Sequence, residues 1–275
     1  MNHNKKRAGI IPYSILFLTA FLFMIPLVWL FLAAFNENAS QALKIPERFS
    51  LSNFIEVLGS GKNRQGFKNS LVISVTQTVI VMVSSLLAAY PLSRYSLKSG
   101  QRITMFILFL TALPITAVMV PVYQLFLVFH LVDTIPGTIL FMSASSLPYA
   151  VWMMKNFLDA VPVELEEAAW IDGASPMKSL LTVVLPLMVP GIFTVCIFTF
   201  MGSWGNFFVP FILLQSNEKV TAAVNLYRFF GERGNVMYNQ LAAYSVIYMM
   251  PVFVLYFFSQ NYMSRGFSMG GGTKG

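Results

Sequence analysis

The stretch that decides the fold lies in the middle of the chain and reads Asp159-Ala-Val-Pro-Val-Glu-Leu-Glu-Glu-Ala-Ala-Trp-Ile-Asp-Gly-Ala-Ser-Pro-Met-Lys-Ser-Leu-Leu181. Pro162 suits the first turn of a helix, and the carboxylates that follow it favour the positive end of the helix dipole. Gly173 can adopt the left-handed conformation that ends a helix, and Pro176 can begin a second one. Residues 159–186 are therefore predicted to form a knob built as helix, glycine and helix.

Long apolar blocks lie on both sides of this knob. A helix crosses a hydrocarbon core about 30 Å thick with roughly 20 apolar residues. The sequence predicts six such spans: Ile10–Phe35, Ser70–Ser93, Ile103–Phe129, Ile135–Met154, Leu187–Leu214 and Tyr238–Tyr262. Spans three and four are separated only by a short break at Asp133–Pro136, which predicts a tight helical hairpin. The expected fold class is an all-α integral membrane protein with six transmembrane helices.

The composition supports this fold class. Of 275 residues, 56% are hydrophobic and only 11% are charged. In a soluble domain, about a quarter of all residues are charged. Soluble enzymes and disordered proteins are thereby excluded. The net charge of +7 does not indicate a nucleic-acid partner, because the cations sit between apolar blocks, where they anchor helices at the headgroups of a lipid bilayer.

Several prolines lie in or at the ends of the predicted spans. Two interpretations explain them equally well: bent helices that line a cavity, and the ordinary tolerance of membrane helices for proline. The residues concerned are Pro12, Pro26, Pro91, Pro114, Pro121, Pro148, Pro210 and Pro251.

The N-terminal cations could belong to a signal peptide, since Lys5, Lys6 and Arg7 precede an apolar block. The block is longer than the apolar region of a signal peptide and lacks a small-residue cleavage site, so a retained first span is expected. The cations before span one and in residues 94–102 favour cytoplasmic N- and C-termini by the positive-inside rule.

The predicted spans contain no carboxylate, although the chain has 11 Asp and Glu residues. Proton-driven carriers use ionisable groups inside the membrane, so a standalone secondary carrier is disfavoured. No nucleophile–base motif occurs, Gly59–Lys62 lacks the residues of a phosphate-binding loop, and Cys196, His3 and His130 cannot assemble a usual Cys/His metal site. The sequence thus predicts a non-catalytic protein without a metal or cofactor, whose energy comes from another polypeptide.

The first helix of the knob has two distinct faces. Leu165, Ala168 and Ala169 share one side, and the neighbouring side is lined by Glu164, Glu167 and Ile171. Adjacent alanines permit close backbone approach, and the carboxylates could pair with Arg or Lys in a partner groove. The alternative is an amphipathic helix lying on the membrane, but an acidic helix suits an anionic inner leaflet poorly. Docking to a protein is therefore favoured.

The pattern Glu167-Ala168-Ala169, with Gly173 and then Val183, Leu185 and Pro186, resembles the EAA loop of ABC-importer permease subunits. The run Glu-Glu-Ala-Ala-x-x-Asp-Gly-Ala-Ser is similar to the carbohydrate-uptake, MalG-like branch of binding-protein-dependent permeases. Phe67-Lys-Asn-Ser-Leu and Trp204-Gly-Asn-Phe-Phe-x-Pro210 are similar to that branch as well. The resemblance covers residues 67–262. Trp170 departs from it, because relatives commonly carry a polar residue there.

This resemblance implies a type I, MetI-like permease fold in a bacterial inner membrane. Residues 1–66 would form the first span and outer loop, 67–262 the permease core, and 263–275 a C-terminal tail. The implied partners are a sister permease in a heterodimer, two ATPase subunits that bind ATP and Mg, and an extracytoplasmic solute-binding protein. The implied ATPase-coupling residues are Glu164, Leu165, Glu166, Glu167, Ala168, Ala169, Asp172 and Gly173.

A carbohydrate is the substrate class that the resemblance implies. Flat apolar rings beside an amide suit the C–H faces and hydroxyls of a sugar, and the candidate pathway residues are Trp204, Asn206, Phe207 and Phe208, with Tyr123 and Gln124 as weaker ones. In the outer segment 215–237, the family implies contact with the binding protein through Arg228, Phe229, Phe230, Gly231 and Gly234; a plain connector is the alternative. A polyol, a glycoside or an amino acid on the same scaffold stays open as substrate.

Overall fold

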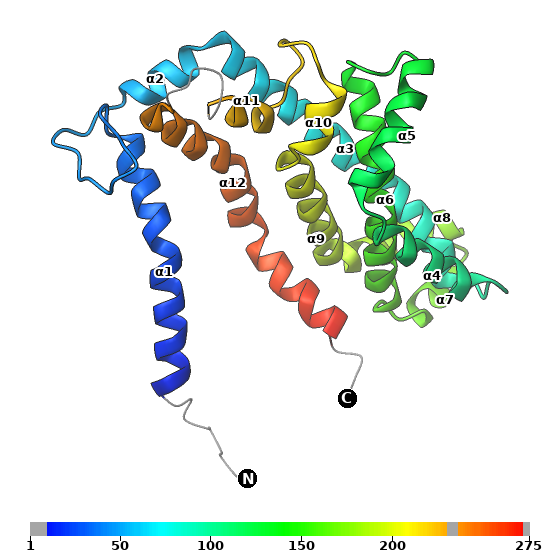
Figure 1. Cartoon of the computed structure of the whole chain (residues 1–275). Coiled ribbons are helices and arrows are strands. Elements are labelled where there is room, and N and C mark those ends of the chain that lie inside the picture. Colours follow the sequence, from blue (N-terminus) through cyan, green and yellow to red (C-terminus); the bar gives the residue numbers. More distant parts are fainter. Residues whose placement is uncertain (1–9, 230–235, 272–275) are drawn as a thin grey trace. The chain divides into compact units, whose positions relative to one another are not determined.

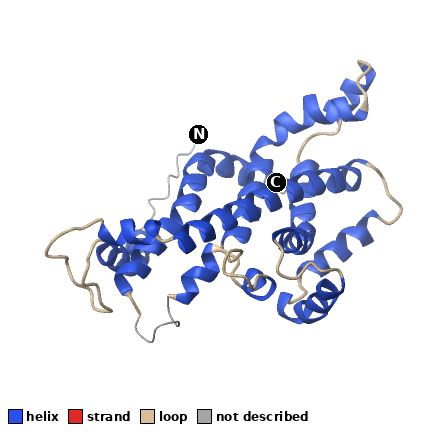
Figure 2. Ribbon diagram, turned by 90° about the horizontal axis from the view of Figure 1, so that it is seen from above, coloured by secondary structure: helices blue, strands red, loops and turns tan. Residues whose placement is uncertain are grey.

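The computed structural model describes residues 10–229 and 236–271, and within these residues it is helical without strands (Figures 1 and 2). Contacts divide the chain into a first unit, residues 1–64 and 226–250, and a second unit, residues 65–225 and 251–275. The helices are α1 (Ile10–Ala34), α2 (Ser52–Gly59), α3 (Gly61–Arg94), α4 (Gly100–Thr111), α5 (Ile115–Val128), α6 (Ile135–Asp159), α7 (Glu164–Ile171), α8 (Pro176–Ser179), a π-helical turn η1 (Leu180–Val184), α9 (Leu185–Trp204), α10 (Phe208–Leu213), α11 (Ala222–Arg228) and α12 (Tyr238–Gly271).

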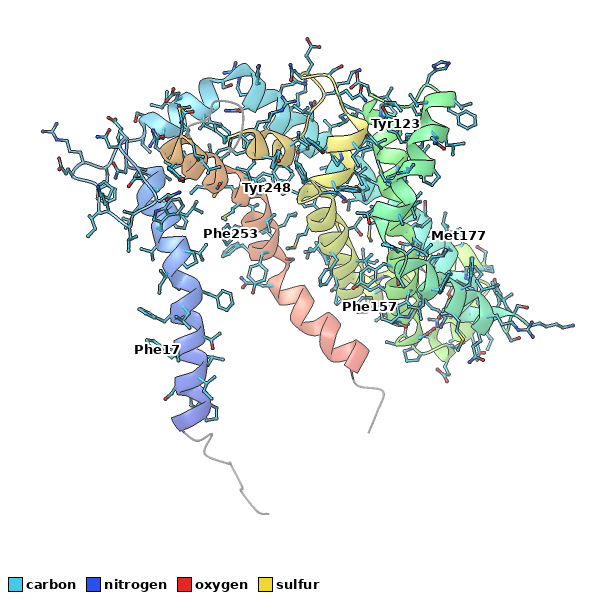
Figure 3. The ribbon with its side chains drawn as sticks, viewed as in Figure 1. Phe17, Tyr123, Phe157, Met177, Tyr248 and Phe253 are labelled. Carbon is cyan, nitrogen blue, oxygen red and sulfur yellow. The ribbon has the colours of Figure 1, made fainter. Side chains whose placement is uncertain are left out.

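In the first unit, asparagines connect the end of α1 to α2 and to the start of α12. The Asn53 side chain donates to the carbonyls of Ala34 and Asn36 at 3.0 and 3.1 Å. Asn239 donates to the Asn53 side chain at 3.0 Å and to the Glu37 carbonyl at 3.1 Å. Most of α1 itself is exposed apolar surface, as at Phe17 (Figure 3). Such a surface requires lipid or a partner chain around it.

The second unit has one apolar cluster near the knob, contributed by α3, α6, η1 and α9. Met154, Leu158 and Val184 are fully buried in it. α9 approaches α6 closely at Gly191, where a Cβ atom would lie 2.4 Å from the ring of Phe157. Phe157 itself is labelled in Figure 3. The close packing of these helices gives the knob a rigid base.

A second apolar cluster lies toward the other end of this unit. Side chains of α3, α5, α6 and α10 form it, among them Phe126 and Phe141, whose rings meet edge to face at a centroid distance of 6.3 Å. Thr134 caps α6 by accepting from the Gly137 N–H at 3.1 Å, with Pro136 in the first turn. The predicted hairpin between α5 and α6 is thus present, and its connection carries the positive-φ residues His130 and Asp133.

The number of apolar helices differs from the six predicted spans. Four described stretches are long and apolar enough to cross a membrane, Pro12–Ala34, Gly61–Arg94, Pro176–Trp204 and Tyr238–Gln260, or five if α4 and α5 count as one. α6 has 25 residues and a sufficient length of about 37 Å. Its run Ser143-Ala-Ser-Ser-Leu-Pro-Tyr149 makes it more polar than the other spans.

The third predicted span is wrong as a single helix. α4 and α5 meet at an angle of 91°, with the break at Ala112–Pro114. Pro114 cannot supply the backbone N–H that a continuous helix needs, and it restricts the residue before it. Apolar residues continue through the break, which is why hydropathy alone did not reveal it.

The fifth predicted span also has different bounds. Helical structure continues from Pro176 through η1 to Trp204, so the span begins inside the knob and not at Leu187. It ends at Trp204, and residues 208–213 form the separate helix α10. The sixth span continues past Tyr262 to Gly271, so the backbone of the expected tail begins as helix.

Candidate functional site

The knob has the predicted architecture of helix, glycine and helix. α7 ends at Ile171, and Gly173 follows in the left-handed region with φ of +85°. The N–H groups of Gly173 and Ala174 close the end of α7 by donating to the carbonyls of Trp170 and Ala169. Ser175 then caps α8 by accepting from the Lys178 N–H at 3.3 Å. A glycine in the left-handed region therefore sets the angle between the two helices.

Glu166 holds the knob to the membrane helices from inside. Its carboxylate forms an ion pair with Arg94 at the end of α3, and the two side chains are 0% and 2% exposed. The Tyr90 hydroxyl donates to Oε1 of Glu166 at 2.8 Å, and Arg94 also donates to the Val161 carbonyl at 3.1 Å. Glu166 is one of the expected ATPase-coupling residues, but both of its oxygens are engaged inside the chain, so its carboxylate is not offered to a partner in this structure.

The Glu166–Arg94 pair is one tether between the knob and α3. A second, more exposed tether lies beside it. Asp159 at the end of α6 accepts from the Ser93 hydroxyl and from Lys155, each at 2.6 Å. Lys155 and Asp159 lie four residues apart on the same helix. Together the two tethers fix both ends of the segment 159–166 against the end of α3.

The outer face of the knob combines apolar and acidic side chains. Ile171, Met177 and Leu165 are 87%, 54% and 44% exposed. Met177 is labelled at this end of the second unit in Figure 3. Glu164, Glu167, Ala168 and Asp172 are exposed in the same segment. Exposed apolar groups together with polar and charged neighbours are typical of a protein-binding surface.

The knob is joined to α9 through the π-helical turn η1. Leu180 and Val184 of this turn are buried in the apolar cluster near the knob. Single π-turns inside α-helices are uncommon and occur frequently at functional sites. Here the turn connects the exposed face of α8 directly to a membrane span.

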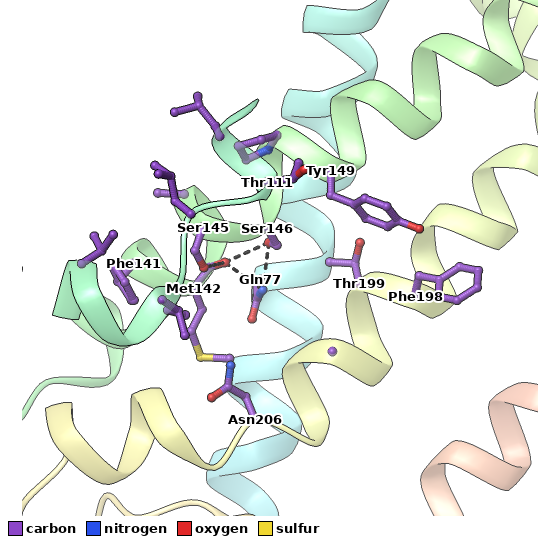
Figure 4. A pocket seen from close by; sticks show the side chains of 17 residues that line it. Gln77, Thr111, Phe141, Met142, Ser145, Ser146, Tyr149, Phe198, Thr199 and Asn206 are labelled. Carbon is purple, nitrogen blue, oxygen red and sulfur yellow. Dashed lines mark hydrogen bonds between the residues drawn. The ribbon is translucent and has the colours of Figure 1, made fainter. Parts of the chain in front are cut away.

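A cavity of about 510 Å³ lies between the two apolar clusters of the second unit (Figure 4). Its volume falls in the range of about 300–1,000 Å³ that is typical of small-molecule sites. α3, α4, α5, α6 and α9 contribute its walls, with Asn206 at the break before α10. The lining residues that carry polar side chains are Gln77, Thr111, Ser145, Ser146, Tyr149, Thr199 and Asn206.

Gln77 is held in a defined orientation at this cavity. Its side-chain Nε2 donates to the Met142 carbonyl at 3.0 Å and to the Ser146 hydroxyl at 3.1 Å. The Oε1 atom on the other side of the amide is buried and has no hydrogen-bond partner in the structure. Figure 4 shows the amide nitrogen turned toward Ser146 and the oxygen turned away from it.

Of the six sequence-predicted pathway residues, only Asn206 lines this cavity. Trp204 is 3% exposed and stacks on Phe200 at a centroid distance of 5.8 Å. Phe207 stacks on Phe211 at 4.9 Å, and Phe208 packs against the second apolar cluster. The Tyr123 hydroxyl accepts from Gln215, while Gln124 is exposed on α5. Packing therefore takes up most of the aromatic rings that the sequence suggested for sugar contact.

The predicted binding-protein residues are described only in part. Arg228 ends α11, and the ring of Phe229 contacts that of Tyr244 at a centroid distance of 5.2 Å. Phe230, Gly231 and Gly234 lie outside the described residues.

Asp133 organises the end of the second unit that lies opposite the knob. Its carboxylate accepts from Lys219 at 2.8 Å and from the backbone N–H groups of Gln215 and Ser216 at 2.9 Å each. Desolvation by burial acts to raise the pKa of the Asp133 carboxyl. The hydrogen bonds from Lys219, Ser216 and Gln215 outweigh this effect and hold the pKa well below its usual range. The connection between α5 and α6 is thereby clamped to the segment after α10.

Sequence reasoning missed Gln77, Arg94 and Asp133. Gln77 is the only amide within Ser70–Ser93, and Arg94 follows that apolar block directly, so both are unusual for their positions. The polar run in α6 was a further signal of a lined cavity. Asp133 had no such signal, because its partners follow more than 80 residues later. Among the described residues, no cluster of His, Cys, Asp or Glu could hold a metal ion.

Comparison with known proteins places this geometry in a family. The profile of the family described as "binding-protein-dependent transport system inner membrane component" matches residues 80–269. A probable ABC transporter permease protein of Pyrococcus horikoshii is 31% identical over 268 residues, which cover 95% of this chain and 97% of the relative. The arabinooligosaccharides transport system permease protein AraQ of Halalkalibacterium halodurans is 31% identical over 259 residues, or 92% of each chain.

Solved structures share the fold. A chain from a bacterial ABC transporter involved in the import of the acidic polysaccharide alginate superposes with a TM-score of 0.81. The alignment covers 96% of this chain and 99% of the other at 20% sequence identity. At that identity the likeness concerns the arrangement of the helices and not the substrate.

Proposed function

Because this chain belongs to the family of binding-protein-dependent transport system inner membrane components, we propose that it is a permease subunit of a carbohydrate importer. In this proposal the energy comes from ATP hydrolysed on a separate ATPase, which also binds the Mg ion. The knob transmits closure of the ATPase to the membrane spans, which alternate between inward-facing and outward-facing states. A second candidate is the same scaffold importing a non-sugar solute, such as a polyol or an amino acid.

The exposed face of the knob is the observation that carries this proposal. Leu165, Ile171 and Met177 offer apolar surface to a groove, and Glu164 and Glu167 offer charges to Arg or Lys at its rim. Glu166 acts from behind as a positioning residue through Arg94. A force on α7 therefore reaches α3 through the ion pair, and a force on α8 reaches α9 through η1.

The proposed partners are a sister permease, two ATPase subunits and a binding protein. The family and the exposed surfaces of the chain support them. The exposed apolar length of α1 supports contact with lipid and with a sister permease, in a heterodimer. Two ATPase subunits would bind the knobs of the two permeases. An extracytoplasmic binding protein would deliver the substrate near the segment 215–237, which includes Arg228 and Phe229. The name of the AraQ relative supports an oligosaccharide as substrate.

The proposed location is a bacterial inner membrane, with the knob and both termini in the cytoplasm. With the knob on this side, its acidic α7 would be repelled by the anionic inner leaflet, which favours coverage of α7 by a protein. The cations before α1 and between α3 and α4 agree with the positive-inside rule.

Reversal of one exposed charge tests the proposal. In cells that express the whole transport system, Glu167→Lys should abolish both ATP-dependent uptake and co-purification of the ATPase, while the amount of permease in the membrane stays unchanged. Glu56→Lys is the matched control, since Glu56 is an exposed carboxylate on α2. Normal uptake with Glu167→Lys would refute the docking role. Uptake by liposomes that hold this chain alone with an ion gradient would instead indicate a secondary carrier.

A further inference from the structure

We propose that the cavity beside Gln77 is a binding site for an uncharged, hydroxyl-rich solute, with Oε1 of Gln77 as a hydrogen-bond acceptor for a solute hydroxyl. The inference rests on the proposed importer function and adds the charge class of the solute. It assigns selectivity to a side chain that the sequence motifs do not include.

The lining of the cavity carries no group that is charged at neutral pH. Its lining residues include no Asp, Glu, Lys, Arg or His. A carboxylate or ammonium group placed here would lose its hydration without gaining an ionic partner, which is strongly unfavourable. The cavity therefore disfavours acidic sugars, amino acids and polyamines.

The polar atoms of the cavity include both acceptors and donors of hydrogen bonds. The hydroxyls of Ser145 and Ser146 donate to the Met142 carbonyl, at 3.0 and 2.8 Å, so their oxygens face a solute as acceptors, although Ser146 also accepts from Gln77. The Asn206 oxygen accepts from the Val209 N–H, which leaves its amide nitrogen as a donor. Both Nε2 hydrogens of Gln77 are directed at protein atoms, so its free atom is also an acceptor. Sugar hydroxyls are donors that complement these oxygens, whereas a carboxylate offers only acceptors.

Gln77 Oε1 is the most specific of these acceptors. It is buried in a 3%-exposed residue without a partner, and a buried acceptor is unfavourable unless it is paired. Gln77 lines the cavity, and rotation about its terminal amide torsion brings the oxygen to a solute hydroxyl, which replaces the hydrogen bonds that Nε2 gives up. Phe141, Phe198 and Tyr149 supply flat apolar faces nearby for the C–H faces of a ring.

The shared fold does not decide this selectivity. The alginate importer with a TM-score of 0.81 takes an acidic polysaccharide, and a fold of one kind can carry sites of different charge. The lining described here contains no cationic side chain that could pair with a carboxylate of the solute. The chain is thereby assigned to neutral sugars or polyols.

The first test uses the complete transporter in proteoliposomes, with labelled maltotriose, arabinotriose and sorbitol as neutral probes and a galacturonate trimer as the acidic probe. We expect uptake of at least one neutral probe and none of the acidic one. Gln77→Leu should raise the KM for the neutral probe about three- to tenfold, as expected for one lost hydrogen bond. Ser74→Ala is the control, because Ser74 also has a buried, unpartnered hydroxyl on α3 but does not line the cavity. It should stay within about twofold of the wild type.

A second test measures solute binding in the cavity without the Gln77→Leu variant, which could fail to fold. In membranes from a Cys196→Ala background, a thiol reagent should label Ser145→Cys, and at least one of the three neutral probes should protect it. Gln101→Cys, exposed at the start of α4 outside the cavity, should be labelled without protection. This measurement needs neither ATP nor the binding protein, so it reports on the cavity alone.

The outcomes separate this inference from the proposed function. Uptake of the galacturonate trimer, an unchanged KM in Gln77→Leu, or no protection of Ser145→Cys would overturn the inference and leave the importer intact. Absence of ATP-dependent uptake for every probe, together with sugar protection of Ser145→Cys, would overturn the importer while the binding site stands.

Discussion

Glu166 and Glu167 are neighbours with opposite environments. Glu166 is buried against Arg94, whereas Glu167 is exposed on the outer face of the knob. Removing one member of a buried ion pair leaves an uncompensated charge and costs about 3–5 kcal/mol. Exposed charges contribute much less. Two adjacent carboxylates of one motif therefore have separable structural and contact roles.

We expect Glu166→Gln to destabilise the purified protein by about 3–5 kcal/mol, because Arg94 keeps its buried charge without a counterion. Glu167→Gln should change stability by less than about 0.5 kcal/mol. Thermal unfolding in detergent measures both variants. Equal stability of the two variants would show that the Arg94 pair does not hold the knob.

Gly173 gives a second prediction at the residue scale. A β-branched side chain at φ of +85° costs about 1–3 kcal/mol, while a Cβ atom at this position would meet no other atom within 4 Å, so no clash adds to that cost. Gly173→Val should therefore reduce ATP-dependent uptake about tenfold with normal membrane insertion. Gly173→Asn should retain most uptake, since asparagine tolerates this conformation. Equal loss in both variants would contradict a purely conformational role.

The Asp133 clamp predicts a dependence on pH. Its folded-state pKa lies below the unfolded value of about 3.9, so its stabilisation is present above about pH 4 and is lost as the pH falls toward the folded value. Asp133→Asn should thus lower the unfolding temperature at pH 7, and its difference from the wild type should shrink below about pH 4. The exposed Glu47→Gln serves as control. A difference independent of pH would exclude the carboxylate as its source.

At the scale of elements, the junction between knob and span is the distinctive feature. Inserting one Ala between Thr182 and Val183 of η1 should rotate α8 by about 100° against α9. We expect the variant to insert into the membrane but to lose ATP-dependent uptake, because the exposed face of α8 no longer lies beside that of α7. Insertion of one Ala after Ala42, in the loop after α1, is the control. Full uptake by the first variant would show that this register is unimportant.

The sequence predicted helix ends well where the type of residue changes along the chain. The knob was predictable because proline, acids and Gly173 mark its helix ends, and the start of α6 was predictable from Thr134 and Pro136. For the bend between α4 and α5, Pro114 was the only signal, and it left a bent helix and an ordinary span as equal interpretations. Hydropathy predicted a single span, because the residues stay apolar on both sides of the bend. The cavity and the Arg94–Glu166 pair depend on contacts between distant helices, which local patterns do not encode.

At the scale of the whole molecule, the orientation in the membrane is the main prediction. In a Cys196→Ala background, a membrane-impermeant thiol reagent should label Glu218→Cys on intact cells and Met177→Cys only after permeabilisation. Both positions are exposed, and they belong to opposite ends of the second unit. The reverse labelling pattern would place the knob on the extracytoplasmic side of the membrane and would refute the proposed coupling to a cytoplasmic ATPase.

The order of the chain gives the buried Arg94–Glu166 pair a consequence for biogenesis. All of α4, α5 and α6 separates its two members, so the pair cannot close until the ribosome has made those helices and the translocon has released them. During synthesis α7 is therefore not yet attached to α3. Under the proposed function, the ATPase would meet its final binding surface only after α4, α5 and α6 have been assembled, which would order the steps by which the complex is built.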